Sequence, residues 1–518
     1  MRLVSLWLVL GSLAACSEDS YVVVTVSARP AVQTATSLQI TLANAGSMRT
    51  DTRALGSHAF PVTFSMSAPG RTGEVDITVE ADDANMLPVG LGTATTTVGA
   101  KTATVMLDTT DFVVNTEYAM DQFLAEGDYE AAGLQLAGAS DGSWIAGFRD
   151  NCNGGTACDI YGRKFDVNGT PQSTVLGAGM NQFVASTDQT ESGAYPAVAS
   201  NGANTLVFWD FTDPTAMTSG VACRSIDSTG ASAADQVTIS TDAADVVTAT
   251  ALSDGNFAVT WQIYSPSNAV RTVNVKSDCT PISAPVTAST TVGTLEGPAH
   301  SHVASNASAN AVMYSWIVDN GMGGDVHVRP GTNNGPSGGD ITVLSHTTDY
   351  VAAMARLTSM GTGFALVVRW VNPNTTGPGK IELFQLDSAG AIQGGANLIT
   401  DQSLSDFTSG DQSFGVATRS DGAILVAWHV CDASGTAGTC DVYGQMVRPD
   451  GTLSGTNFMI PTTTTGDQTG PSVIAPTMTA PEAFVVAWTD QSQTPPDTQG
   501  MAVRARILYP AYDASGSN

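Results

Sequence analysis

Basic side chains are the scarcest group in this sequence. Lysine and arginine together number 20 among 518 residues, against 48 aspartates and glutamates, and the formal net charge is −28. A field of that sign repels nucleic acid and anionic lipid surfaces. We therefore expect no nucleic-acid partner, and we interpret the acidity as a solubilising surface for a salty or cation-rich exterior.

Compact catalytic motifs are missing as well. The sequence has no phosphate-binding glycine loop, dinucleotide fingerprint or HExxH motif. It also has no DxDxDG run of the kind that binds calcium. We expect no cofactor. An enzyme is not excluded, because a carboxylate pair for glycoside hydrolysis can meet only in the folded chain.

Helical periodicity is absent beyond the first residues, and only 13% of the residues are charged. Short runs of alternating valine, isoleucine, phenylalanine and threonine recur instead, separated by glycine-rich turns. This pattern predicts an all-β protein.

The N-terminus has the layout of an export signal. Arg2 is followed by an apolar run over residues 3–13, which is too short to span a bilayer. The run ends in Leu-Ala-Ala-Cys at Cys16, which resembles the bacterial lipobox. The resemblance implies a signal peptide over residues 1–15, a lipidated linker over 16–20, and acyl chains such as palmitate on Cys16. An ordinary secretory signal with a chance cysteine is the alternative.

The polar residue after the lipobox carries a further implication. Ser17 resembles the signal for delivery to the outer membrane, facing either the periplasm or the cell surface. Three acyl chains would anchor the protein firmly in the membrane, since one chain alone is marginal.

Six of the seven cysteines lie beyond the signal. An even number in an exported chain fits disulfides in an oxidising compartment. Two of the expected bonds each close a short loop at the same place in two repeats. The predicted pairs are Cys152 with Cys158, Cys431 with Cys440 and, by elimination, Cys223 with Cys279. No CxxC pair exists, so we expect no zinc site built from cysteine.

Residues 21–108 are expected to form a small immunoglobulin-like β-sandwich that acts as a spacer. Candidate strands lie at 21–28, 37–44, 61–68, 74–81, 89–97 and 102–107, each with alternating apolar residues. The pattern resembles the membrane-proximal sandwich domains of bacterial surface lipoproteins.

One hydrophobic segment recurs seven times between residues 111 and 510. Its aromatic residues are Phe148, Trp209, Trp261, Trp316, Trp370, Trp428 and Trp488. The intervals by subtraction are 61, 52, 55, 54, 58 and 60 residues. Periods of about 40–60 residues with four short strands per unit are typical of β-propeller blades.

The ends of the repeat region indicate a closed ring. The last repeat stops at its third strand, near residues 503–508, while residues 111–115 precede the first repeat and are similar to a fourth strand. Pairing them would leave no free sheet edge. We therefore predict a seven-bladed β-propeller over residues 111–510 and a disordered tail over 511–518. Tandem β-sandwich repeats are the alternative, because repeat 5 has an extra residue and repeat 4 lacks a clear third-strand motif.

Three weaker patterns in the sequence bear on chemistry. The first is a Ser-Asp-Gly triplet that begins at Ser140, Ser253 and Ser420. It resembles the Asp-box of sialidase propellers but lacks the residue between serine and aspartate, so we interpret it as a tight turn. The second is a set of arginines that a sialidase would need to converge. Arg149, Arg163, Arg224 and Arg356 are scattered in the sequence.

Histidine gives the third pattern. Four of the six histidines, His300, His302, His327 and His346, fall in the fourth repeat. His300 and His302 share one face of a strand, so they are the candidates if a metal binds. His327 should be two strands away, roughly 10 Å, and we predict no metal site.

Over nearly its whole length the chain resembles predicted bacterial surface lipoproteins with propeller-like repeats, a family that implies location and fold but no activity. Long loops at 150–159, 210–220, 372–380 and 489–500 join the second and third strands and should gather on one face. We predict that these loops bind a protein or polysaccharide partner without catalysis. A glycan hydrolase or lyase and a structural envelope component are the alternatives.

Overall fold

The computed structural model describes residues 21–32, 34–67, 71–100, 102–115, 136–150, 159–172, 183–186, 192–213, 215–226, 235–263, 268–289, 294–295, 301–319, 324–372, 379–400, 414–431, 440–477, 482–498 and 500–509. The chain divides into two compact units, Met1–Thr109 and Thr110–Asn518. Within the described ranges, no helix is long and apolar enough to cross a membrane. The signal peptide, Cys16 and the tail over residues 511–518 lie outside them.

The N-terminal unit is a seven-stranded sheet with the order β3-β2-β5-β6-β7-β1-β4. Its elements are β1 (Tyr21–Ala28), the 3-10 turn η1 (Pro30–Val32), β2 (Ser37–Asn44), β3 (Ser47–Ala54), β4 (Val62–Ser67), β5 (Glu74–Asp82), β6 (Pro88–Thr97) and β7 (Thr102–Thr109). Alternate residues such as Val22, Val24 and Val26 are at most 2% exposed and form the core on one face.

Strand β7 makes this sheet continuous. Its first six residues pair in parallel with β1, and its last two pair with β6. The two layers of the expected sandwich are therefore joined through one strand into a curled half-barrel. Strand β3 was not among the expected strands, because it is a polar edge strand whose residues are nearly all exposed and show no apolar alternation.

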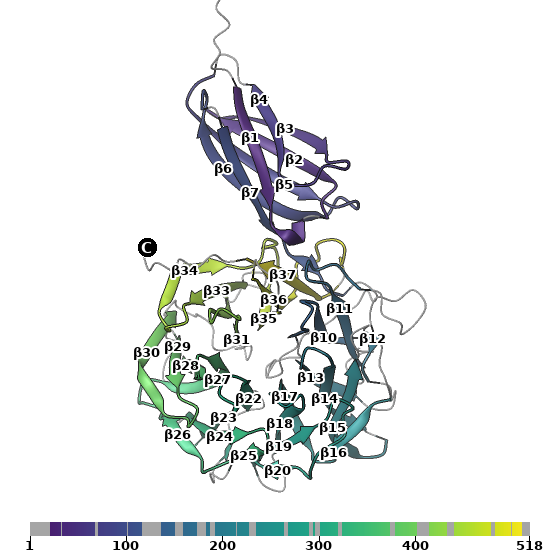
Figure 1. Ribbon diagram of the computed structural model, residues 1–518, viewed down its shortest axis with the longest axis vertical. Coiled ribbons are helices and arrows are strands. Elements are labelled where there is room, and N and C mark those ends of the chain that lie inside the picture. Colours follow the sequence, from purple (N-terminus) through teal and green to yellow (C-terminus); the bar gives the residue numbers. More distant parts are fainter. Residues whose placement is uncertain are drawn as a thin grey trace, which may run out of the picture. The chain divides into compact units, whose positions relative to one another are not determined.

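The second unit is a seven-bladed β-propeller (Figure 1). Blade 1 is β9 (Leu136–Gly138), β10 (Trp144–Asp150), β11 (Asp159–Phe165) and β12 (Phe183–Val184). Blade 2 is β13 (Ser192–Ser200), β14 (Thr205–Asp213), β15 (Thr218–Ile226) and β16 (Val237–Ser240). Blade 3 is β17 (Ala244–Ala251), β18 (Phe257–Ile263), β19 (Ala269–Val275) and β20 (Val286–Thr287). Blade 4 is β21 (Thr294–Leu295), β22 (His302–Asn306), β23 (Ala311–Asp319), β24 (Gly324–Thr332), β25 (Gly335–Pro336) and β26 (Ile341–Leu344).

The remaining blades follow in chain order around the ring (Figure 1). Blade 5 is β27 (Val351–Met360), β28 (Gly363–Val371), β29 (Lys380–Leu386) and β30 (Ile392–Thr400). Blade 6 is β31 (Phe414–Thr418), β32 (Ile424–Val430), β33 (Asp441–Val447) and β34 (Leu453–Met459). Blade 7 is β35 (Gln468–Ile474), β36 (Phe484–Asp490) and β37 (Ala502–Leu508) with β8 (Phe112–Val113).

The repeated aromatic position is confirmed as the second strand of each blade. All seven aromatic side chains are at most 5% exposed, because this strand is covered by the neighbouring blade on each side. The third strands of blades 1 and 6 each contain a Tyr-Gly pair, Tyr161-Gly162 and Tyr443-Gly444, and packing explains the glycine. A Cβ on Gly162 would lie 2.2 Å from the ring of Phe183 on the fourth strand, so glycine is required there.

The ring closes as predicted. In β8, Phe112 pairs with Ala505 and Val113 pairs with Arg504 of β37, so the tandem-sandwich alternative is wrong. The irregular repeats are accommodated locally. Blade 4 gains the short strands β21 and β25, and blade 5 has a register shift between Ala352 and Met354.

A buried ion-pair network reinforces the closure. Arg504 Nη1 lies 3.1 Å from Asp111 Oδ1, and its Nε lies 2.7 Å from Asp490 Oδ2. The arginine side chain is 4% exposed and both carboxylates are 1% exposed. Asp111 also accepts hydrogen bonds from the backbone and hydroxyl groups of Thr462 and Thr463.

Arginines on third strands connect neighbouring blades. In four junctions, a guanidinium Nη1 donates to a carbonyl just past the fourth strand of the preceding blade. The pairs are Arg163 to Val114 (2.6 Å), Arg224 to Ala185 (3.4 Å), Arg329 to Ala288 (2.8 Å) and Arg506 to Ile460 (2.6 Å). Arg163 and Arg224, which are scattered in the sequence, therefore stabilise two different blade junctions and do not form a catalytic cluster.

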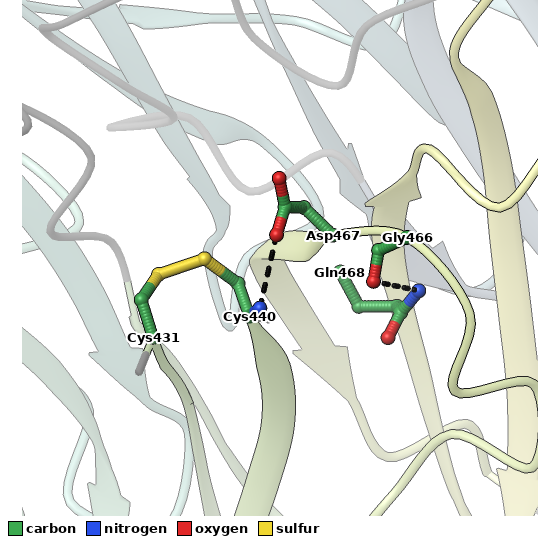
Figure 2. The surroundings of a disulfide bond; sticks show 5 residues. All are labelled: Cys431, Cys440, Gly466, Asp467 and Gln468. Atoms are coloured by element: carbon green, nitrogen blue, oxygen red, sulfur yellow. Dashed lines mark hydrogen bonds between the residues drawn. A yellow bond between two sulfur atoms is a disulfide. The ribbon is translucent and has the colours of Figure 1, made fainter. Parts of the chain in front are cut away.

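Two of the three predicted disulfides are present. Cys223 on β15 bonds Cys279, which joins blade 2 to blade 3 across 56 residues of sequence. Cys431 bonds Cys440 between β32 and β33. Figure 2 shows this second bond beside Asp467, whose Oδ1 accepts the amide of Cys440 at 3.0 Å. Cys152 and Cys158 lie outside the described residues.

Candidate functional site

The Ser-Asp-Gly triplets form the predicted turns between first and second strands. Gly142, Gly255 and Gly422 have φ angles of +82°, +87° and +86°, which glycine adopts without strain. In the first triplet, Asp141 Oδ1 accepts hydrogen bonds from the amide of Ser143 at 3.0 Å and from its hydroxyl at 2.5 Å. The first role of the motif is thus structural.

Adjacent turns are connected around this face of the ring, which we call the turn face. Ser140 Oγ donates to Gly202 O at 3.0 Å, and Asn201 Nδ2 donates to Gly255 O at 2.7 Å. These bonds link blade 1 to blade 2 and blade 2 to blade 3. Hydrogen bonds therefore hold the turns of blades 1, 2 and 3 together on the turn face.

A cavity of about 300 Å3 opens between the turns of blades 1 and 2, and we call it the crevice. Its polar walls come from both blades and include Ser140, Asp141, Ser143, Lys164 and Thr205, while Ile145 contributes apolar surface. Lys164 is only 6% exposed, whereas Asp141 is exposed. The crevice thus combines an ammonium group, a carboxylate and hydroxyls within one concave site.

The carboxylate of the crevice is held in its charged form. The hydroxyl hydrogen bond from Ser143 lowers the pKa of Asp141 below its usual value, and Lys164 lowers this pKa further. A charged carboxylate is a strong acceptor for hydroxyl donors. The neighbouring ammonium offsets its charge, so the crevice also suits a ligand without net charge.

The central channel holds a second cavity, of about 370 Å3. The first strands of the blades, with small or weakly polar residues such as Ala199 and Ser200, form its wall at their ends nearest the turn face. His302 lies in this wall, and its Nδ1 accepts the amide hydrogen of Leu357 at 3.3 Å.

The three described histidines of blade 4, His302, His327 and His346, do not gather at one point. His327 lies on the third strand, two strands from His302, as predicted. It stacks on Trp316 at 6.1 Å, and His346 pairs with Asp325 at 2.7 Å. Among the described residues, no group of three or more potential ligands is found. The other candidate, His300, lies outside them.

A pair of carboxylates lies at the opposite end of the blade 2–blade 3 junction from the turn face. Trp209 packs among residues of blade 1, so strand alternation turns Asp210 toward blade 3, where Asp245 begins the first strand. Val246 beside it has φ +48° at a register shift, which is rare for a β-branched residue. Burial, and then the charge of Asp245, raise the pKa of Asp210 to about 8.

Three of the predicted long loops, at 150–159, 372–380 and 489–500, join second and third strands at the end of the propeller opposite the turn face. The prediction of a long loop at 210–220 is wrong, because β14 extends to Asp213 and pairs there with Thr218 of β15, so that only residues 214–217 lie between the two strands. Residues 151–158, 214, 373–378 and 499 within these segments lie outside the described part of the chain. The prediction that these loops bind a partner therefore stays a prediction.

The residues of the crevice could not be identified from the sequence. Asp141 is predicted only as a turn residue, and Lys164 carries no signal. The crevice exists because Ser140 and Gly202, 62 residues apart, are brought together by blade packing. One sequence contains no measure of that proximity.

No family model matches the chain, and no curated protein matches it. Solved structures with a similar fold include a prolyl endopeptidase with 12% identity and a TM-score of 0.39; the match covers 81% of this chain but only 52% of that one. The β-propeller domain of the Trilobed protease from Pyrococcus furiosus is 8% identical, with 78% and 100% covered and a TM-score of 0.42. An α-L-arabinofuranosidase from Fusarium graminearum is 12% identical, with 60% and 91% covered and a TM-score of 0.38. At these values the comparisons assign no activity to the chain.

Proposed function

We propose that the chain is a lipid-anchored protein of the bacterial cell envelope whose propeller binds a polysaccharide at the crevice without cleaving it. The export signal with Cys16 supports the location, and the acidic composition suits an exterior surface. The single observation that carries the function is the crevice between blades 1 and 2.

The chemistry of the crevice matches carbohydrate. A sugar hydroxyl both donates and accepts hydrogen bonds, and the crevice offers the charged acceptor Asp141 beside the donor Lys164. Its volume of about 300 Å3 is at the lower end of ligand pockets. That size fits one sugar unit of a chain.

Affinity electrophoresis tests the proposal. Full-length protein in detergent is run through native gels cast with different polysaccharides, and the charge of −28 drives migration. The Asp141→Asn variant is compared with Asp254→Asn, which changes the corresponding turn of blade 3 and shifts the net charge equally. Loss of a hydrogen bond to a charged group costs about 1.5–3 kcal/mol, so we expect Asp141→Asn to weaken retardation about tenfold or more.

The control variant should be retarded like the wild type. Equal retardation of both variants would refute binding in the crevice. Free migration of the wild type in every gel would refute polysaccharide binding and favour a protein partner or a structural role in the envelope.

The Asp210–Asp245 pair favours a second candidate function, glycan cleavage by a hydrolase or lyase. A protonated acid beside a second carboxylate is the arrangement that glycoside cleavage uses. Incubating the protein with a polysaccharide that retards it, and measuring new reducing ends and unsaturated products, tests this candidate. Turnover that disappears in Asp210→Asn would replace simple binding with catalysis.

A further inference from the structure

The channel cavity has a wall of unusual uniformity. Its described lining residues are small aliphatic and hydroxyl side chains with the single imidazole of His302, and none of them is charged at neutral pH. First strands such as β13, β17 and β27 stand at the inner edge of their sheets, so one row of their backbone N–H and C=O groups also faces the channel.

Two pairs of hydroxyls bridge neighbouring blades in this wall. Ser305 Oγ donates its hydrogen to Ala251 O at 2.5 Å and lies 3.2 Å from Thr250 Oγ1. A hydroxyl has one hydrogen, so Thr250 must be the donor in the second contact. The oxygen of Thr250 therefore keeps lone pairs that can accept a hydrogen bond from a ligand.

The same arrangement recurs across blades 5 and 6. Thr418 Oγ1 donates to Ser359 O at 2.5 Å, and Thr358 Oγ1 lies 2.9 Å from Thr418 Oγ1. Thr358 is then the donor within this pair, and its oxygen is also left with acceptor capacity. Two matched acceptors from different blades thus line one cavity.

His302 supplies a donor. Because its Nδ1 accepts the amide of Leu357, the hydrogen of the neutral ring is on Nε2. Burial of the imidazole within the propeller, and then the charge of Arg356, lower the pKa of His302 to about 3. The ring therefore stays neutral over the physiological pH range. This tautomer also leaves no lone pair on Nε2 for a metal.

We propose that the central channel is a second carbohydrate subsite, which takes an uncharged sugar unit through the acceptors Thr250 and Thr358 and the donor His302. A charged ligand would lose hydration beside a wall whose described lining residues carry no charge. A neutral polyol brings both donors and acceptors, which match the wall. The volume of about 370 Å3 accommodates one such unit.

The two cavities are neighbours. Ala137 lines both of them, so a glycan in the crevice passes close to the channel. The inference deepens the proposed function and rests on it only in taking the natural ligand to be a polysaccharide. Binding of a free sugar in the channel does not require the crevice, and the two proposals can fail separately.

Nuclear magnetic resonance of the histidine side chains tests the channel subsite. The full chain is labelled at histidine, and the His302 signal is assigned by its loss in His302→Gln. D-glucose and D-glucuronate are titrated as the neutral and charged probes. We expect glucose to shift the Nε2–H signal of His302 and glucuronate to leave it unchanged.

Matched variants locate the effect. Thr250→Val and Thr358→Val should each weaken glucose binding up to about tenfold, the effect of one hydrogen bond. Thr238→Val, at an exposed residue of the outer strand of blade 2, and Asp141→Asn in the crevice should not weaken it. No shift with glucose, an equal shift with glucuronate, or equal affinity in the channel and control variants would overturn the proposal.

Discussion

Replacing Arg504 by methionine tests how the propeller ring is held closed. The methionine keeps most of the apolar stem but removes the charge that faces Asp111 and Asp490. Both carboxylates are 1% exposed, so neither can be hydrated without opening the blade. Breaking a buried ion pair by removing one partner costs about 3–5 kcal/mol.

The structure places the expected cost at the lower end of this range. Asp111 keeps four hydrogen bonds from Thr462 and Thr463 after the substitution, so part of its charge stays compensated. We therefore expect Arg504→Met to lower the free energy of unfolding by about 3 kcal/mol, a roughly 150-fold change in the folded-to-unfolded ratio.

Urea denaturation followed by tryptophan fluorescence measures this effect. Seven of the eight tryptophans lie in the propeller, and the eighth is Trp7 of the export signal, so the signal reports on the ring. Lys276→Met in an exposed turn is the control. Amide hydrogen exchange should also rise in β37 and β8 before it rises in β10 and β11. A variant no less stable than the control would refute the claim that this network holds the ring closed.

Three further predictions concern the blade junctions. Burial raises the pKa of Asp210 from 3.8 to about 8 in the folded state, so the folded state binds more protons than the unfolded state between those pH values. The contribution of Asp210 to the free energy of unfolding should therefore be fully present below pH 3.8, and it should be lost as the pH rises to about 8. Asp210→Asn should flatten that slope in denaturation curves recorded across pH, and an unchanged slope would contradict the assignment. Replacing Cys223 and Cys279 by serine should lower the free energy of unfolding by about 4 kcal/mol, and the same change at Cys431 and Cys440 by about 2.6 kcal/mol. The two bonds close loops of 56 and 9 residues, and the longer loop gains more entropy when its bond is removed. Equal losses in urea denaturation would contradict this reasoning. Arg163→Met should lower the free energy of unfolding by about 1.5–3 kcal/mol in the same assay, and Arg448→Met should lower it less. The reverse order would contradict the role of Arg163 at the blade junction.

The fold could be predicted because its signal is repeated. Tryptophans such as Trp261 and Trp428 recur at blade intervals because the second strand is buried on both faces. The closure was visible because residues 111–115 have the character of the strand that the last repeat lacks. Strand β3 was missed for the converse reason, since a polar edge strand such as Ser47–Ala54 needs no apolar alternation.

The candidate sites could not be predicted in the same way. Asp141 and Asp254 stand in identical Ser-Asp-Gly turns, yet only the first lies in the crevice, because Lys164 comes from another strand and Gly202 from the next blade. The spacing of His300 and His302 indicates only a candidate metal ligand. The hydrogen bond from the Leu357 amide to His302 fixes the tautomer, and that contact depends on the packing of blade 5 against blade 4.

Amide hydrogen exchange with and without a bound polysaccharide tests the central claim most directly, since it follows both faces of the propeller in one experiment. Binding at the crevice and channel predicts protection of the turn face, at residues 139–145 and 200–205 and at the ends of the first strands. Protection confined to the loops between second and third strands, with the turn face unchanged, would contradict the claim and place recognition on the opposite face.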